Sequence, residues 1–122
     1  MALSSTPSIT YITSRMVKET DVNSTPNGNI TGTNSKLYSL DLNNTHSQKA
    51  FFKIYDLGAV TYGTSTPDIS IPVPNGTRQT VTIAEGVSFT NAVSWAASQG
   101  PATLAGSALT GGALVAIATL ID

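Results

Sequence analysis

The stretch FFKIYDLGAVTYGTSTPDISIPVPNGTRQTVTIAEGVSFTNAVSWAA, residues 51–97, decides the fold class of this chain. It contains four short runs in which apolar and polar residues alternate, separated by residues that favour turns. Alternation with a period of two is typical of half-buried β-strands, because successive side chains point to opposite faces of a sheet. The stretch therefore predicts β structure, and no part of the chain shows a convincing amphipathic helix period.

Turn and edge signals inside this stretch predict how two of its runs are placed. Pro72 interrupts Ile69–Val73, and because proline cannot donate to a ladder, this strand is expected at a sheet edge or beside a bulge. Asn75-Gly76 is the commonest dipeptide of tight hairpins. It predicts a hairpin that joins Ile69–Val73 to the run containing Val81 and Ile83.

Further strands are predicted on either side of the stretch and at its end. The apolar faces that define them are Tyr38, Leu40 and Leu42, then Phe52 and Ile54, then Phe89, Val93 and Trp95 with Asn91 on the same face. The final segment, Leu114–Ile121, is apolar on both faces, which predicts a strand that is central or covered by partner protein. Seven to eight strands at roughly ten-residue spacing indicate an all-β fold, an antiparallel β-sandwich or jelly roll.

The first 35 residues are polar and rich in turn formers, and they predict an N-terminal arm with a hairpin or loop before a core domain at residues 36–122. Tyr11–Thr20 is expected to be a strand, followed by a loop or hairpin tip built on Pro26-Asn27-Gly28. Two interpretations of the arm stay open. It is either mobile or an extension that lies across a neighbouring subunit. The whole chain is one domain.

Composition excludes several classes of protein. The 122 residues carry a formal net charge of −1 with scattered basic residues, which argues against a nucleic-acid partner. The absence of cysteine excludes disulfides and thiolate metal sites. The N-terminus lacks the basic start and apolar core of a signal peptide. Only 11% of the residues are charged, against about 25% in typical soluble proteins, which favours a surface that packs against other protein.

The uncharged segment between Glu85 and Asp122 raises a membrane hypothesis, because residues 102–121 are about as long as a bilayer-spanning helix. Gly106, Gly111 and Gly112 interrupt the run, and its most apolar part is only as long as a strand. A buried strand is the favoured interpretation, with no membrane partner.

Few residues offer reaction chemistry. His46 is the only histidine and lies in the turn NNTHSQ, where a solvent-exposed side chain is expected. Asp56 and Asp68 stand at the two ends of one loop, so they are candidates for a carboxylate pair or an ion site. Aspartates at turn positions more commonly cap backbone amides, which is the favoured interpretation. No enzyme activity and no cofactor are therefore expected.

Aromatic residues support one further alternative, a carbohydrate-binding module that contacts host glycans. Tyr55 and Tyr62 are expected to be the exposed rings, because Phe52 and Ile54 occupy the inward face of their strand. Trp95 is the third candidate for stacking on sugar, although at strand spacing aromatic residues more often fill a core.

Four short motifs follow one another in an order that resembles a known family. They are Phe52-Lys53-Ile54-Tyr55-Asp56, Gly63-Thr64-Ser65-Thr66-Pro67-Asp68, Ile71-Pro72-Val73-Pro74 and Gly86-Val87-Ser88-Phe89-Thr90. In this order and spacing the chain resembles small virion structural proteins of tailed bacteriophages over about half its length, residues 50–97. It departs from the family at Thr90-Asn91-Ala92, where the family usually has a glycine after the aromatic residue.

The resemblance implies a non-enzymatic building block of phage particles, made in the host cytoplasm. The best-fitting role is a capsid decoration or cement protein on the shell, as a homo-oligomer and specifically a trimer, with the major capsid protein or another virion protein as partner. A tail, knob or baseplate component is the alternative. The residues expected at interfaces are Thr6, Ile9, Tyr11, Asn27, Gly28, Tyr62, Gly63, Thr64, Leu114 and Ile117.

Overall fold

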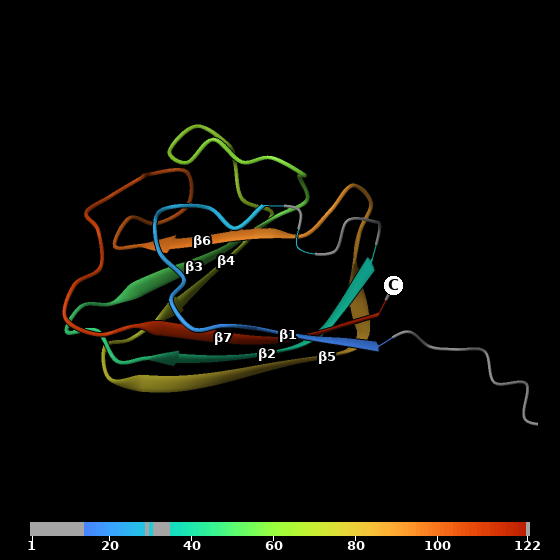
Figure 1. The fold of residues 1–122 in the computed structure, drawn as a ribbon, viewed down its shortest axis with the longest axis horizontal. Coiled ribbons are helices and arrows are strands. Elements are labelled where there is room, and N and C mark those ends of the chain that lie inside the picture. Colours follow the sequence, from blue (N-terminus) through green and yellow to red (C-terminus); the bar gives the residue numbers. More distant parts are fainter. Residues whose placement is uncertain (1–13, 29, 31–34, 122) are drawn as a thin grey trace, which may run out of the picture.

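The structure is a computed structural model that describes residues 14–28, 30 and 35–121. These residues form strands and connecting segments without a helix, which confirms the all-β class. The strands are β1 (Ser14–Glu19), β2 (Ser35–Asn44), β3 (Ala50–Tyr55), β4 (Ile69–Val73), β5 (Thr77–Phe89), β6 (Ser94–Ser98) and β7 (Leu114–Ile121). They make two antiparallel sheets, one in the order β1-β7-β2-β5 and one in the order β4-β3-β6, which lie one above the other in Figure 1.

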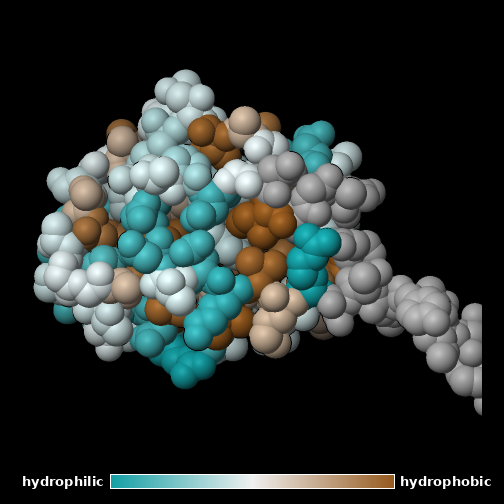
Figure 2. Space-filling model, viewed as in Figure 1, coloured by the Kyte–Doolittle hydropathy of each residue, from teal (hydrophilic) through white to brown (hydrophobic). Residues whose placement is uncertain are grey.

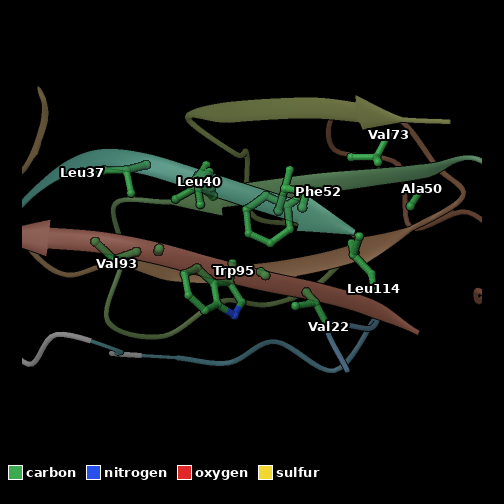
Figure 3. Close-up of a cluster of buried hydrophobic side chains, with 14 of the residues drawn as sticks. Val22, Leu37, Leu40, Ala50, Phe52, Val73, Val93, Trp95 and Leu114 are labelled. Atoms are coloured by element: carbon green, nitrogen blue, oxygen red, sulfur yellow. The ribbon is translucent and has the colours of Figure 1, made fainter. Parts of the chain in front are cut away.

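The hydrophobic core lies between the two sheets and takes side chains from both. Phe52 and Trp95 extend from the three-stranded sheet, and their ring centroids are 5.6 Å apart with the planes tilted by 49°. Figure 3 shows these rings among aliphatic side chains of the opposite sheet. The fully buried members also include Val22, Leu37, Leu40, Leu42, Ile54, Val73, Val93, Leu114 and Leu120. This shared core explains why each sheet has an apolar inner face.

The last strand has the bounds that its sequence predicted. β7 lies between β1 and β2, so the prediction of a central strand is confirmed. Every second side chain, beginning with Leu114 and ending with Leu120, is buried in the core, while the alternate ones are half-buried on the outer side. In the described part of the chain, no helix has the length and apolar character needed to cross a bilayer.

The edge position of β4 is confirmed, but the predicted hairpin between β4 and β5 is wrong. β4 pairs with β3, whereas β5 pairs with β2 in the other sheet. The turn itself is present, since the Thr77 N–H donates to the Pro74 carbonyl at 3.3 Å and Gly76 has a φ of 65°. The Asn44 amide donates to the Val73 and Pro74 carbonyls and ties the end of β4 to the opposite sheet. A tight turn therefore moves the chain between sheets, and local turn chemistry does not reveal which strands pair.

The prediction that Tyr38 faces the core is also wrong, because β2 contains a bulge. The register of β2 shifts between Leu37 and Ser39 against both neighbouring strands. As a result Leu37 and Leu40 are both buried, and Tyr38 lies against Gly86 instead. A Cβ atom at Gly86 would lie 2.9 Å from Tyr38 Cζ, so this bulge requires a glycine there.

Residues 89–97 do not form the single strand that their alternation predicted. Phe89 ends β5 in one sheet and Trp95 lies in β6 of the other, with a corner between them at residues 90–93. Asn91, expected on the buried face, is exposed at this corner. Both large side chains still reach the core because it is shared by the two sheets.

The segment expected to be an arm and loop is joined to both sheets. β1 pairs with β7 from Ser14↔Ile121 to Glu19↔Ala116. Beyond it, Asn27 and Trp95 form a two-way backbone bridge, with N···O distances of 2.9 and 3.1 Å. Residues 23–28 together with Ile30 thus pair along the free edge of β6.

Candidate functional site

The two sheets differ in what covers their outer faces. The outer face of the three-stranded sheet carries Lys53, Tyr55 and Ser98, and all three are buried. Figure 1 shows why, since the loops at residues 56–68 and 99–113 lie over β3 and β6 on the side away from the four-stranded sheet. The three-stranded sheet is therefore covered by its own chain over β3 and β6, while Ser70 and Pro72 on the outer side of β4 are exposed.

A polar network fixes these two loops over the sheet. The buried Lys53 ammonium donates to the Tyr62 hydroxyl at 3.0 Å and to the Leu104 carbonyl at 2.6 Å, and it lies 4.9 Å from the centre of the Tyr62 ring. The Tyr62 hydroxyl donates to Ser98 Oγ, which in turn donates to the Ala105 carbonyl. Each polar group of this network has a partner, so it is a clasp between loops and leaves no reactive group free.

The aromatic residues expected to stack on sugar are placed elsewhere. Tyr55 and Trp95 are each only 1% exposed, so the expectation that Tyr55 is exposed is wrong. Burial, and then the proximity of Tyr62, raises the pKa of Tyr55 to about 12. Tyr62 is half-buried with its hydroxyl bound in the clasp. The pattern misplaced Tyr55 because it does not show that loops cover the outer face of its strand.

His46 is buried, contrary to the expectation of an exposed turn residue. Its side chain is 5% exposed, Nδ1 lies 3.1 Å from the Thr110 carbonyl, and Nε2 is buried without a hydrogen-bond partner. Its backbone N–H donates to Asn44 Oδ1. The loop at residues 99–113 folds back over this turn and brings the Thr110 carbonyl to His46. This long-range contact could not be predicted from the sequence pattern. Among the described residues, no group of three or more His, Asp or Glu side chains is arranged to hold a metal ion.

Asp56 and Asp68 cap backbone amides, as their turn positions predicted. Asp68 Oδ2 accepts the Asp56 N–H at 2.7 Å. The Asp56 carboxylate accepts the N–H groups of Thr90, Asn91 and Ala92 at 3.1, 2.8 and 3.3 Å. The same carboxylate thus holds the corner between β5 and β6.

Within the part of the chain that the structure describes, no loop lies over the outer face of the four-stranded sheet. We call it the open face; it is formed by Met16, Lys18, Ser39, Asp41, Asn43, Arg78, Thr80, Thr82, Val115, Ile117, Thr119 and Ile121. An open hollow of about 290 Å³ lies on it, lined by Lys18, Thr20, Asp41, Asn43, Arg78, Val115 and Ile117. Met16 at its edge is 74% exposed. The open face thus combines an apolar strip along β7 with polar strands on either side.

One ion pair marks the polar side of the open face. Arg78 Nε donates to Asp41 Oδ1 at 2.8 Å, and Arg78 also binds Asp41 Oδ2. The hydrogen bond from Arg78 holds the pKa of the Asp41 carboxyl below its usual value. On the other side of β7, Lys18 has no ion-pair partner among the described residues. Among the described residues, the face therefore carries an unpaired cation on β1 and a carboxylate on β2 that Arg78 neutralises.

The expected interface residues are distributed over several parts of the fold. Thr6, Ile9 and Tyr11 lie outside the described residues. Asn27 is engaged in its bridge with Trp95, so it is not a free loop tip, while Gly28 beside it is exposed. Leu114 is fully buried in the core and has no surface for a partner; this correction follows from the alternation of β7.

Three more of the expected positions reach the surface, besides Gly28. Gly63 and Thr64 are exposed in the loop at residues 56–68, and Ile117 is half-buried in the open face. Tyr62 precedes them but belongs to the clasp. Sequence reasoning did not select Lys18, Asp41 or Arg78, because their grouping depends on which strands pair.

Comparison with protein-family models, curated protein sequences and solved structures finds no match to this chain. Function is therefore argued from the surface itself. On the side of the molecule seen in Figure 2, hydrophobic residues reach the surface in small groups among hydrophilic ones. The open face, with Val115, Ile117 and Ile121 along the outer side of β7, is a stronger candidate for a contact surface than the side seen in Figure 2.

Proposed function

We propose that this chain is a structural protein of a phage virion that acts by protein–protein contact, and that it serves as a capsid decoration or cement protein. Its two sheets then form a β-sandwich of the jelly-roll type. The observation that carries the proposal is the open face, over which no loop of the described residues lies. The order of motifs that resembles phage virion proteins is the reason for proposing a phage particle as the assembly.

The composition of the open face supports protein contact. In an antiparallel sheet with one wet face, the outward side chains are normally polar. Three of the four outward positions on β7, namely Val115, Ile117 and Ile121, are apolar instead. The exposed Met16 extends this surface onto β1. Apolar cores with polar rims are typical of sites that bind other proteins.

The proposed mechanism is mass action. A protein that binds the assembled shell and not its dissociated subunits shifts the equilibrium toward the shell. The regular pairing of β1, β7 and β2 favours this role, because it fixes the backbone of the open face before binding. A surface ordered in advance loses less conformational entropy when it docks.

The test compares particles with and without this chain. Particles that lack it are expected to release genome at lower temperature or under milder osmotic shock. Purified chain added back should restore resistance, whereas Ile117→Asp should not, because it places a carboxylate in the apolar strip.

Leu104→Asp is the matched control, since Leu104 is 65% exposed but belongs to the loops on the opposite side. It should restore resistance as well as the natural sequence does. Equal robustness of particles with and without the chain would reject the role. The number of copies per particle separates shell decoration from a tail, knob or baseplate position.

A further inference from the structure

We propose that Asn75 is a site of spontaneous covalent modification, at which the side-chain amide is lost as ammonia and the turn between β4 and β5 gains a carboxylate. The reactants are the Gly76 backbone nitrogen and water. No virion partner takes part, so this reaction stands apart from the proposed function. The chain has two Asn-Gly pairs, Asn27-Gly28 and Asn75-Gly76, which share the same chemistry but differ in their surroundings.

The reaction needs a backbone nitrogen that can reach the side-chain amide of the preceding residue. The Gly76 nitrogen attacks Asn75 Cγ, so that an N–Cγ bond forms and the Cγ–Nδ2 bond breaks. Nδ2 leaves as ammonia with the proton of the Gly76 N–H, and a cyclic imide remains. Glycine favours this step because no side chain shields its nitrogen and its backbone turns freely.

Water then opens the imide at one of its two carbonyl carbons. Breaking the new N–Cγ bond leaves an aspartate at position 75. Breaking the original peptide bond leaves an iso-aspartate, in which the main chain runs through Cγ. Either product replaces a neutral amide with a negative charge, and neither requires an oxidant, a reductant or an enzyme.

The surroundings of Asn75 leave both reacting groups accessible. Asn75 and Gly76 are exposed, and within the described chain neither the Asn75 side chain nor the Gly76 N–H has a hydrogen-bond partner. A Cβ atom at Gly76 would meet nothing within 4 Å. The turn is held by the Thr77 N–H and hydroxyl, which donate to the Pro74 carbonyl at 3.3 and 2.7 Å. Asn75 and Gly76 can therefore change conformation without breaking a hydrogen bond of their own.

The surroundings of Asn27 oppose the same reaction. Its N–H donates to the Trp95 carbonyl at 2.9 Å, its carbonyl accepts the Trp95 N–H at 3.1 Å, and Nδ2 donates to Glu19 Oε2 at 3.4 Å. Asn27 is half-buried, and a Cβ atom at Gly28 would lie 3.1 Å from the Gly58 carbonyl oxygen. Ring closure requires the peptide bond to rotate and the amide to leave Glu19, so these contacts must open first.

The position of Asn75 gives the modification a structural consequence. The chain passes from β4 in one sheet to β5 in the other at this turn. Iso-aspartate adds a carbon to the main chain between Pro74 and Thr77, the two residues whose hydrogen bonds close the turn. Modified chains should accumulate with the age of the protein, because the reaction needs only water and asparagine is a thermally labile residue.

Timed incubation of the folded natural chain in warm neutral buffer, followed by trypsin digestion and mass spectrometry, tests the proposal. The tryptic peptide of residues 54–78 contains Asn75 as its only asparagine, so a mass gain in it identifies the site. Asn27 lies in the peptide of residues 19–36 and is located there by fragmentation. Asn75 should react at least about tenfold faster than Asn27, since opening two backbone hydrogen bonds lowers the reactive population by about that factor.

The chain unfolded in urea is the matched control. Without the Trp95 and Glu19 contacts, the two Asn-Gly pairs should react at similar rates, so the difference in the folded chain reports on structure and not on the dipeptide. Asn75→Gln should leave the peptide of residues 54–78 unmodified, because glutamine must close a larger and slower ring. An Asn75 that keeps its amide in the folded chain, or that reacts no faster than Asn27 there, would overturn the proposal.

Discussion

Replacing Asp56 with asparagine removes the charge that holds the corner between β5 and β6. In the folded chain the carboxylate accepts the N–H groups of Asn91, Thr90 and Ala92 at 2.8, 3.1 and 3.3 Å. Asparagine keeps one acceptor oxygen and presents an NH₂ group where the other stood. At least one backbone N–H then faces a donor.

The magnitude follows from these three contacts. Hydrogen bonds to a charged group contribute about 1.5–3 kcal/mol each. Thr90 and Asn91 are exposed, so water replaces part of what is lost. We expect the free energy of unfolding to fall by about 2 kcal/mol in total, which lowers the melting temperature of a chain of this size by roughly 8 °C.

The pH dependence gives a second signature. Burial raises the pKa of Asp56, but the bonds from Asn91, Thr90 and Ala92 outweigh it and hold the pKa below 3.8. A carboxyl with a depressed folded pKa stabilises the fold above its unfolded pKa, and this contribution is lost as the pH falls through the folded pKa. The difference between the two proteins should be complete at pH 7 and shrink below about pH 4.

Urea unfolding of the natural chain, Asp56→Asn and Asp21→Asn measures the effect. Asp21 is exposed, and its carboxylate contacts only the side chain of Asn23 among the described residues. The same change at Asp21 should therefore cost less than about 0.5 kcal/mol. Equal stability of the two variants at pH 7, or a loss at Asp56 that persists unchanged at pH 2, would refute the reasoning.

Three other substitutions test the packing. Gly86→Ala should lower the free energy of unfolding by about 1–3 kcal/mol, because φ is 74° there and the new Cβ would meet Tyr38; an unchanged urea midpoint would contradict the bulge. Phe52→Ala should cost about 3–5 kcal/mol and red-shift the emission of Trp95, the only tryptophan, whose ring contacts Phe52; unchanged emission would contradict that contact. Tyr62→Phe should cost about 1–3 kcal/mol by removing an acceptor from the buried ammonium, and thermal melting with no loss would show that the clasp does not stabilise the fold.

Alternation along single strands could be predicted from the sequence. The bounds of β7, the edge position of β4 and the two apolar faces of the core follow from side-chain period and from Pro72. These features depend on residues that are near neighbours in the chain. Asp56 also belongs here, because an aspartate at a turn caps amides whichever strands surround it.

Pairing between distant segments could not be predicted. Asn75-Gly76 correctly predicted a turn but not that the chain changes sheet there. The change of sheet depends on a long-range contact, in which the Asn44 amide of β2 binds the Val73 carbonyl at the end of β4. Burial of His46 and Lys53 depends on the loop at residues 99–113, which is polar and gives no periodic signal. Tyr38 was misplaced because the bulge between Leu37 and Ser39 interrupts the alternation that would have put it on the same face as Leu40 and Leu42.

For the open face too, alternation predicted the direction of side chains but not which strands lie side by side. Alternation indicated that Asp41 points away from Leu40 and Leu42. It did not indicate that Ile117 separates Asp41 from Lys18, because only the register of β1, β7 and β2 sets that row. The candidate site is therefore made of residues whose outward direction was predictable and whose grouping was not.

Oxidation of Met16 by dilute peroxide tests most directly whether the open face is covered by protein in the assembly. Its side chain is 74% exposed at the edge of that face, so it should react almost as fast as free methionine in the dilute chain. Mass spectrometry of the tryptic peptide, with free methionine as the internal reference, gives the rate in each state. On assembled particles the rate is expected to fall severalfold. An unchanged rate on particles would show that the open face remains in water and would contradict its role as the contact surface.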